Sequence, residues 1–94
     1  MHSLYILYSE SIDKYYVGES KNADIRRNLH NNHHFKKGFT TAASDWVIVL
    51  NFECTSKVDA LYLENFIKRM KSTKFIKKII ADREILTDIL GNRN

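Results

Sequence analysis

The sequence predicts an α+β layer fold, in which a small β-sheet is flanked by helices in the order β-β-α-β-α-α. Three short runs are rich in aromatic and β-branched residues, and apolar residues recur at helical spacing between and after these runs. Three strands cannot hide both faces of a sheet from water, so the helices should pack on them. With 94 residues, the chain is expected to form one domain, residues 1–94.

The composition is that of a folded protein rather than a disordered one. Hydrophobic residues make up 44% of the chain and charged residues 28%. No apolar run exceeds five residues, whereas a transmembrane helix needs about 20, so no membrane span is expected. The first residues lack the pattern of a secretory signal, and Cys54 is the only cysteine. We therefore expect a cytoplasmic protein without an internal disulfide.

The first two β-prone runs predict a hairpin. Residues 4–8 and 15–18 are separated by a polar, turn-like segment. Alternation along a strand should place Tyr5 and Tyr8 on opposite faces of the sheet. Gly18 ends the second run, which indicates a bulge or a close approach to another backbone.

The first helix is predicted to begin after Asn22. The Asn22 side chain can cap a helix, and Asp24 in the first turn suits the positive end of the helix dipole. The helical pattern ends near Asn31, and residues 31–45 then form a long polar loop. Loops of this length in compact domains are often functional.

The second half of the chain predicts one strand followed by helices. Residues 46–52 are aromatic and β-branched and make the strongest strand pattern. The next helix should begin at Thr55 or Ser56. A third helical pattern covers residues 75–90. We interpret residues 81–94 as an additional helical tail.

The charge of the chain is positive and unevenly distributed. Fifteen Lys and Arg residues oppose eleven Asp and Glu residues, giving a net charge of +4. A basic surface of this kind can hold phosphates, although a basic run can also be a solvated helix face. The segment 65–81 contains no acidic residue and carries Lys68, Arg69, Lys71, Lys74, Lys77 and Lys78.

Glu64 does not fit a simple amphipathic helix. Its neighbours at helical spacing are Ala60, Leu61 and Ile67. A carboxylate on an apolar face is costly unless it is paired or binds a cation. The alternative is that Glu64 lies at the edge of the apolar stripe and pairs with Lys68 at i+4.

Arg26 and His30 lie four residues apart on the first predicted helix, so their side chains should share one face. A guanidinium and an imidazole together suit an anionic phosphoryl group. The alternative is a solvated helix face. His33 and His34 lie in the polar loop, where we expect solvated histidines rather than metal ligands.

In their order and spacing, these residues resemble a GIY-YIG nuclease domain, in particular the small single-domain bacterial members. The likeness covers most of the chain, and the core it implies is residues 3–80. It departs from the family where Ser3 replaces the first motif glycine and where the asparagine after the last core helix has no match. The two signature triplets are matched by residues 3–5 (SLY) and 16–18 (YVG), and the arginine, histidine and glutamate of the family by Arg26, His30 and Glu64.

The resemblance implies a three-stranded antiparallel sheet flanked by helices, with an active site on the sheet face. It also implies hydrolysis of DNA phosphodiester bonds with Mg²⁺ or Mn²⁺. Mg²⁺ is usually held by only one or two carboxylates, so Glu64 alone can be the metal ligand. Arg26 would bind the non-bridging phosphate oxygens. Tyr5 or Tyr16 would orient or deprotonate the attacking water, and His30 is a second candidate for handling the proton.

DNA contact is expected mainly through phosphates, which position a protein but carry no base information. We therefore expect loose or structure-dependent specificity, in a DNA-repair setting. Two other classes of function stay open: a nucleic-acid-binding module of the same fold that cleaves poorly, and a small interaction protein with an incidental charge. The predicted DNA-binding residues are Lys36, Lys37, Lys68, Arg69, Lys71 and Lys74.

Overall fold

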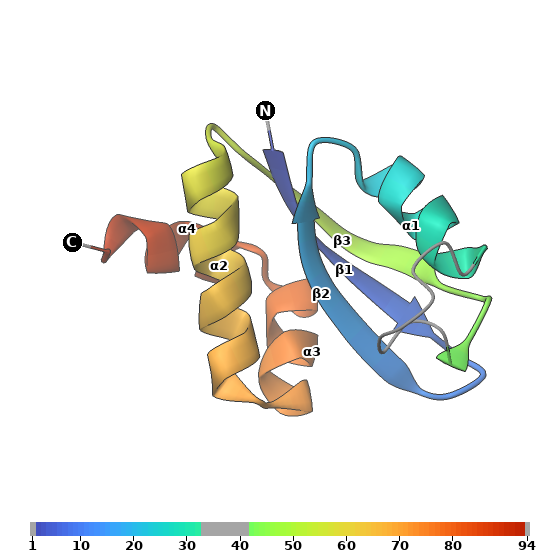
Figure 1. Cartoon of the computed structure of the whole chain (residues 1–94). Helices are drawn as coiled ribbons and strands as arrows, with labels where there is room; N and C mark the ends of the chain where they lie inside the picture. Colours follow the sequence, from blue (N-terminus) through green and yellow to red (C-terminus); the bar gives the residue numbers. More distant parts are fainter. Residues whose placement is uncertain (1, 33–41, 94) are drawn as a thin grey trace.

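The computed structural model describes residues 2–32 and 42–93. Their arrangement confirms the predicted α+β fold (Figure 1). The helical pattern predicted at the end of the chain is divided into two helices. The elements in chain order are β1 (His2–Ser9), β2 (Lys14–Ser20), α1 (Ala23–Asn31), β3 (Val47–Cys54), α2 (Lys57–Met70), α3 (Thr73–Ala81) and α4 (Glu84–Gly91).

The sheet is antiparallel, and its strand order is β2-β1-β3. The first strand of the chain is therefore the central one, with hydrogen-bonded neighbours on both sides. In this register Tyr5 lies opposite Gly18 on β2 and opposite Asn51 on β3. Ser3, two residues earlier on β1, lies opposite Glu53 on β3.

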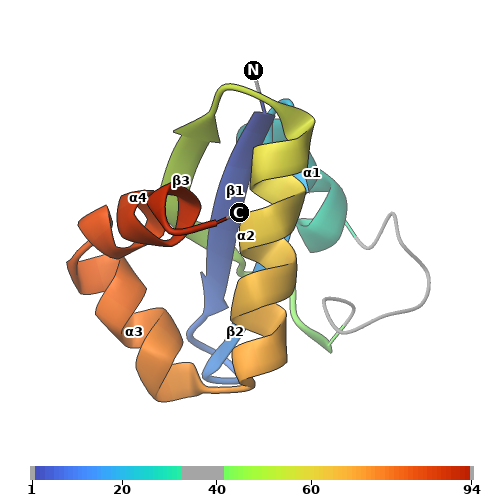
Figure 2. The same ribbon diagram turned by 90° about the vertical axis from the view of Figure 1, so that its left-hand side faces the viewer.

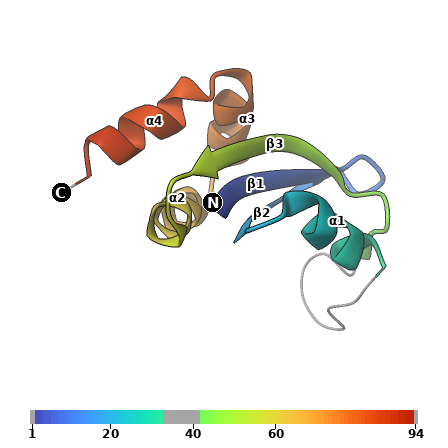
Figure 3. The same ribbon diagram turned by 90° about the horizontal axis from the view of Figure 1, so that it is seen from above.

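One face of the sheet is apolar and carries the main core. Figures 2 and 3 show α3 and α4 on this side of the sheet and α1 on the other. Helix α2 contributes to this core through Ala60, Leu63 and Ile67, along the β2 and β1 side of the sheet. The buried residues of the core are Leu4, Ile6, Val17, Leu50, Cys54, Ala60, Leu63, Ile67, Ile79 and Leu86.

The opposite face is covered by α1 and holds a smaller cluster. Its buried members are Tyr5, Leu7, Ala23, Ala43 and Trp46. As alternation predicted, Tyr8 lies on the other face from Tyr5, with its ring centroid 4.7 Å from that of Tyr15.

Asn31, the last residue of α1, joins this helix to the chain before β3. Its amide group donates to the Trp46 carbonyl at 2.9 Å and accepts from the Trp46 N–H at 2.7 Å. This two-point contact resembles a pair of strand hydrogen bonds. It holds the end of α1 against the sheet.

Side-chain caps begin the first three helices. Asn22 accepts from the N–H of Ile25 at 3.1 Å, which confirms its predicted role. Ser56 caps α2 and Ser72 caps α3 in the same way. Each bond satisfies a backbone donor that has no partner within its own helix.

The third helical pattern breaks at Asp82. Its backbone leaves the helical region (φ −142°), and its carboxylate accepts from the N–H of Glu84 at 3.2 Å, where α4 begins. Ile79 before the break and Leu86 after it are both fully buried. None of the helices in residues 2–32 and 42–93 is long and apolar enough to cross a membrane.

Candidate active site

Tyr5 lies at the centre of the α1 face, and it depends on a glycine beside it. Its side chain is 0% exposed. A Cβ atom on Gly18 would lie 2.6 Å from the Tyr5 hydroxyl oxygen and 2.7 Å from its Cζ. The β1–β2 register is continuous through Gly18, so the predicted bulge is absent there. The close approach is real, but it is made by a side chain and not by another backbone.

Helix α1 brings Arg26 and His30 to this tyrosine. The Tyr5 hydroxyl lies 3.3 Å from His30 Nε2, and Tyr5 also hydrogen-bonds to the Arg26 side chain. The Tyr16 ring lies 4.8 Å from the His30 ring, between centroids. His30 is only 3% exposed, so the alternative of a solvated helix face is wrong for this residue.

Burial sets the protonation states of two groups in this cluster. Burial and the neighbouring Tyr16 raise the pKa of Tyr5 to about 12, although Arg26 acts in the opposite direction. Burial and the Arg26 charge lower the pKa of His30. At neutral pH, Tyr5 therefore keeps its proton and can donate, whereas His30 is uncharged and has one ring nitrogen that can accept.

Glu64 reaches the same cluster from α2. Its carboxylate accepts from Lys68 Nζ at 2.6 Å, and its side chain is 17% exposed against 47% for Lys68. The charge of Glu64 contributes to the raised pKa of Tyr5. Both interpretations of Glu64 therefore hold together, because the carboxylate is paired with Lys68 and also lies beside the tyrosines.

Lys68 also contacts the cluster directly. Its Nζ lies 5.5 Å from the centroid of the Tyr16 ring, within the range of a cation–π contact. With Arg26, two cations therefore accompany the carboxylate of Glu64. This balance favours an anionic ligand such as a phosphate.

The other basic residues lie outside this cluster. Tyr62, Asn65, Lys68, Arg69 and Lys71 line a shallow hollow on α2, and Lys74 is exposed on α3. Lys36 and Lys37 lie outside the described residues, as do His33 and His34.

The donor set suits a weakly held, hydrated metal ion. Within the described ranges, no three His, Cys, Asp or Glu side chains come close enough to form a metal cage. Mg²⁺ commonly keeps several waters and is held by one or two carboxylates and the substrate phosphate. Glu64, mostly buried near Tyr16 through its partner Lys68, fits that mode of binding.

Comparison with known proteins identifies the family. A family model, the GIY-YIG catalytic domain, matches residues 1–78. The chain belongs to the GIY-YIG family. No curated protein and no solved structure matches it at a significant level. GIY-YIG domains are nucleases that act on DNA and generally use divalent metals, so this chain has a nuclease-type catalytic domain.

Two features of this GIY-YIG domain were missed by the sequence analysis. Asn51 faces the site beside Tyr5, and it could have been noticed as a polar residue inside an otherwise apolar strand. The contact between Lys68 and Tyr16 had no sequence signal, because it joins two elements whose packing is set by the whole fold.

Proposed function

We propose that this GIY-YIG domain is an endonuclease that hydrolyses DNA phosphodiester bonds with Mg²⁺ or Mn²⁺. One observation carries the proposal. Side chains from two strands and two helices form a single connected cluster beside α1. Its members are Tyr5, Tyr16, Arg26 and His30, with Glu64 joined to them through Lys68, which contacts both Glu64 and the Tyr16 ring.

Arg26 is the proposed phosphate-binding residue. Its guanidinium presents a planar set of donors, which suits the non-bridging oxygens of a phosphodiester. These oxygens gain negative charge in the transition state, so a donor already held in place by its contact with Tyr5 stabilises that state.

Removal of the proton from the attacking water is assigned to Tyr16 or His30 rather than to Tyr5. The pKa of Tyr5 is raised to about 12, so it keeps its proton at neutral pH, is a poor base, and serves as a donor that orients its neighbours. His30 is uncharged at neutral pH because its pKa is lowered, and it can therefore accept a proton. Tyr16 is only partly buried and can hold the water against the His30 ring.

Glu64 is the proposed metal ligand. The metal would stabilise the leaving oxygen and the extra negative charge of the transition state. Lys68 bonds one oxygen of the Glu64 carboxylate, and its charge competes with a metal for that group. The substrate phosphate offers Lys68 a new partner. Lys68, Arg69, Lys71 and Lys74, with Lys36 and Lys37 on the polar loop, are proposed to contact the DNA backbone with little regard to sequence.

Nicking of supercoiled plasmid DNA tests this proposal. The wild-type chain should nick in Mg²⁺ or Mn²⁺ and stop when EDTA removes the metal. Glu64→Gln keeps the shape of the side chain and should lower the rate by about 10³-fold or more, because the metal supplies several kcal/mol of stabilisation.

Glu10→Gln is the matched control, since it makes the same change on an exposed residue of the β1–β2 turn. It should nick at the wild-type rate. The melting temperature of Glu64→Gln should stay within a few degrees of wild type, because Lys68 is half-exposed and can be solvated. Nicking by Glu64→Gln at the wild-type rate would remove Glu64 from the reaction.

A second candidate function is a nucleic-acid-binding module that cleaves poorly. The ion pair between Glu64 and Lys68 favours it, because the charge of Lys68 competes with a metal for the carboxylate. This alternative predicts DNA binding that weakens steeply with salt, without nicking in any divalent metal. Replacing Lys68, Lys71 and Lys74 with Ala should then flatten the salt dependence by roughly one unit per lost phosphate contact.

A further inference from the structure

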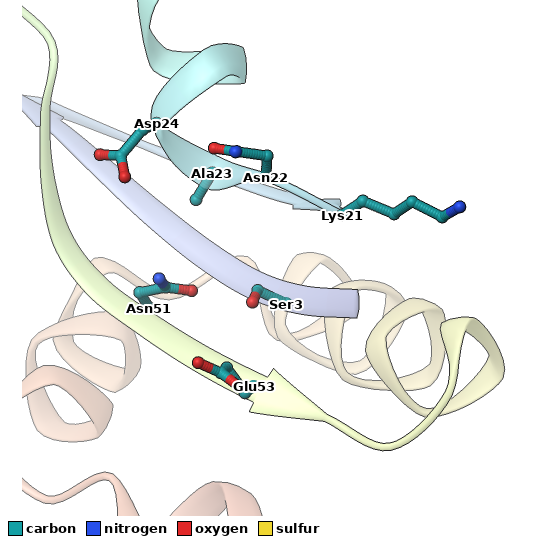
Figure 4. Close-up of a pocket in the computed structure, with 7 residues that line it drawn as sticks. All are labelled: Ser3, Lys21, Asn22, Ala23, Asp24, Asn51 and Glu53. Atoms are coloured by element: carbon teal, nitrogen blue, oxygen red, sulfur yellow. The ribbon is translucent and has the colours of Figure 1, made fainter. Parts of the chain in front are cut away.

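A second hollow lies next to the candidate active site on the same face of the sheet. It has a volume of about 430 Å³ and is bounded by β1, β3 and the start of α1 (Figure 4). Asn51 in its wall is the cross-strand neighbour of Tyr5, and Ser3 is two residues before Tyr5 on the same strand face. Asn22, at the other wall, lies one helical turn before Arg26.

Ser3 presents a hydroxyl group to this hollow. The residue is only 7% exposed, and its side chain makes no hydrogen bond to any part of the chain that the structure describes. Figure 4 shows its oxygen directed into the space toward Asn51 and Glu53. The Ser3 oxygen is not among the fully enclosed polar atoms that lack a partner, so water reaches it through the hollow. A ligand seated in the hollow can take the place of that water.

The hollow is rich in hydrogen-bond acceptors, and one of its two carboxylates, that of Asp24, lies 3.9 Å from an Arg27 nitrogen. The carboxylates of Asp24 and Glu53 and the amide of Asn51 lie around it, whereas Lys21 extends away (Figure 4). Neither Asn51 nor Glu53 has a side-chain hydrogen bond within the described residues. Because acceptors outnumber free donors around the hollow, it favours a ligand that presents donors.

Its size and position suit part of a nucleotide. Two residues along a strand span about 7 Å, so a nucleotide whose phosphate lies near Tyr5 and Arg26 extends to Ser3. A single Mg²⁺ or Ca²⁺ ion needs several oxygens within about 2.6 Å of one point, whereas this hollow is open and as large as a small molecule. A base edge needs only a few matched donors and acceptors.

We propose that this hollow binds an unpaired base of the DNA substrate next to the bond that is cut, and that it selects a base with an exocyclic amino group. Asp and Glu accept hydrogen bonds from the amino group of cytosine, and Asn pairs with adenine. Thymine has no exocyclic amino group, and its O4 oxygen would face carboxylates. This inference rests on the proposed nuclease function and adds a base preference to an otherwise backbone-directed enzyme.

Cleavage of matched oligonucleotides tests the preference. The substrates differ at one unpaired nucleotide beside the cut, which is dC, dA, dG or dT. We expect cleavage of the amino-bearing substrates to exceed that of the dT substrate by about tenfold, the effect of one well-matched base contact. In the double variant Asp24→Asn, Glu53→Gln this ratio should approach one, whereas the control Glu10→Gln should keep it. Equal cleavage of all four substrates by the wild-type chain would overturn the inference.

A binding experiment separates this inference from the nuclease proposal. Deoxycytidine and thymidine monophosphates are titrated into the wild-type chain while NMR amide shifts are followed. Selective shifts of Ser3, Asn51 and Glu53 with deoxycytidine monophosphate support base binding, even if no substrate is cleaved. Equal or absent shifts overturn it. Shifts of the same amides with Mg²⁺ alone, without nucleotide selectivity, would assign the hollow to a cation instead.

Discussion

The two faces of the sheet are built from the same strands but differ in what they bury. The face toward α2, α3 and α4 buries almost only hydrocarbon, with Leu4 and Ile6 at its centre. The face toward α1 buries a phenol, an imidazole and a serine hydroxyl, in Tyr5, His30 and Ser3. Because side chains alternate along a strand, successive residues of β1 point in turn to the apolar core and to the candidate active site.

Because of this difference, amino-acid substitutions should have different consequences on the two faces of the sheet. Apolar contacts are non-directional, so their loss costs stability in proportion to the volume removed. The contacts of the α1 face depend on hydrogen-bond distance and on protonation state. Substitutions on the core face should therefore change stability most, and those on the α1 face should change activity, metal affinity or pH dependence.

The largest effect on stability is expected for Leu63→Ala. Leu63 is fully buried in the core and directly precedes Glu64 on α2. Such a truncation costs about 2–5 kcal/mol of the free energy of unfolding. The total for a small domain is only about 5–15 kcal/mol, so the melting temperature should fall by about 10 °C or more. Thermal unfolding followed by circular dichroism measures this, and a shift under 3 °C would contradict the core assignment.

Gly18→Ala should have the next largest effect, and it acts on the α1 face. The added Cβ would lie 2.6 Å from the hydroxyl oxygen of Tyr5, whose ring is enclosed and cannot turn away. Overpacking of this kind costs about 1–3 kcal/mol, and it should also lower nicking because Tyr5 must move away from His30. Urea denaturation measures the stability. Gly91→Ala is the matched control, since a Cβ there meets nothing within 4 Å.

Lys68→Met should raise the affinity of the free protein for Mn²⁺. Lys68 holds the carboxylate of Glu64 at 2.6 Å, and it competes with a metal for that group. Because Lys68 is half-exposed, the gain should be modest, about two- to fivefold. Calorimetric titration with Mn²⁺ measures it, and Lys78→Met provides the same change of net charge on α3. Equal Mn²⁺ affinities in the two variants would show that Lys68 does not compete with the metal for Glu64.

The smallest effect is expected in the pH dependence of stability. The pKa of folded His30 is lowered, so the unfolded chain takes up a proton more readily than the folded one. Its contribution to stability is present at neutral pH and is lost as the pH falls below about 6.5, the ordinary value for histidine. Wild type should therefore lose stability toward pH 5 more than His30→Gln does. Parallel pH profiles from denaturant titrations would argue against a buried, neutral His30.

The sequence predicted the element order and several helix starts because those depend on local chemistry. The cap at Asn22 needs only the residues of one turn, and it is present as predicted. The break at Asp82 was not predicted, because the apolar residues on either side were taken as one pattern. The local signal was there: residues 82–84 are all charged, so the apolar spacing lapses where the Asp82 carboxylate begins the next helix.

The candidate site was predictable as a set of residue types but not as a set of contacts. Spacing and family resemblance singled out Arg26 and Glu64. They could not give the approach of Tyr5 to Gly18 or of Lys68 to Tyr16, since these depend on strand register and on how α2 packs against β2. The hollow at Ser3 depends on the same register, because Asn51 and Glu53 come from a distant strand.

The end of α3 and the whole of α4 determine where this chain can be truncated or fused to another protein. The family match ends at residue 78, yet Ile79 and Leu86 beyond it are fully buried against the core. Arg93 pairs with Asp59 near the start of α2, the helix that carries Glu64. A cut at the family boundary would therefore remove the support behind the metal-binding helix. Conversely, a protein fused after Arg93 would be connected to α2 through the Arg93–Asp59 ion pair. A force applied to the fused protein would therefore act on the helix that carries Glu64.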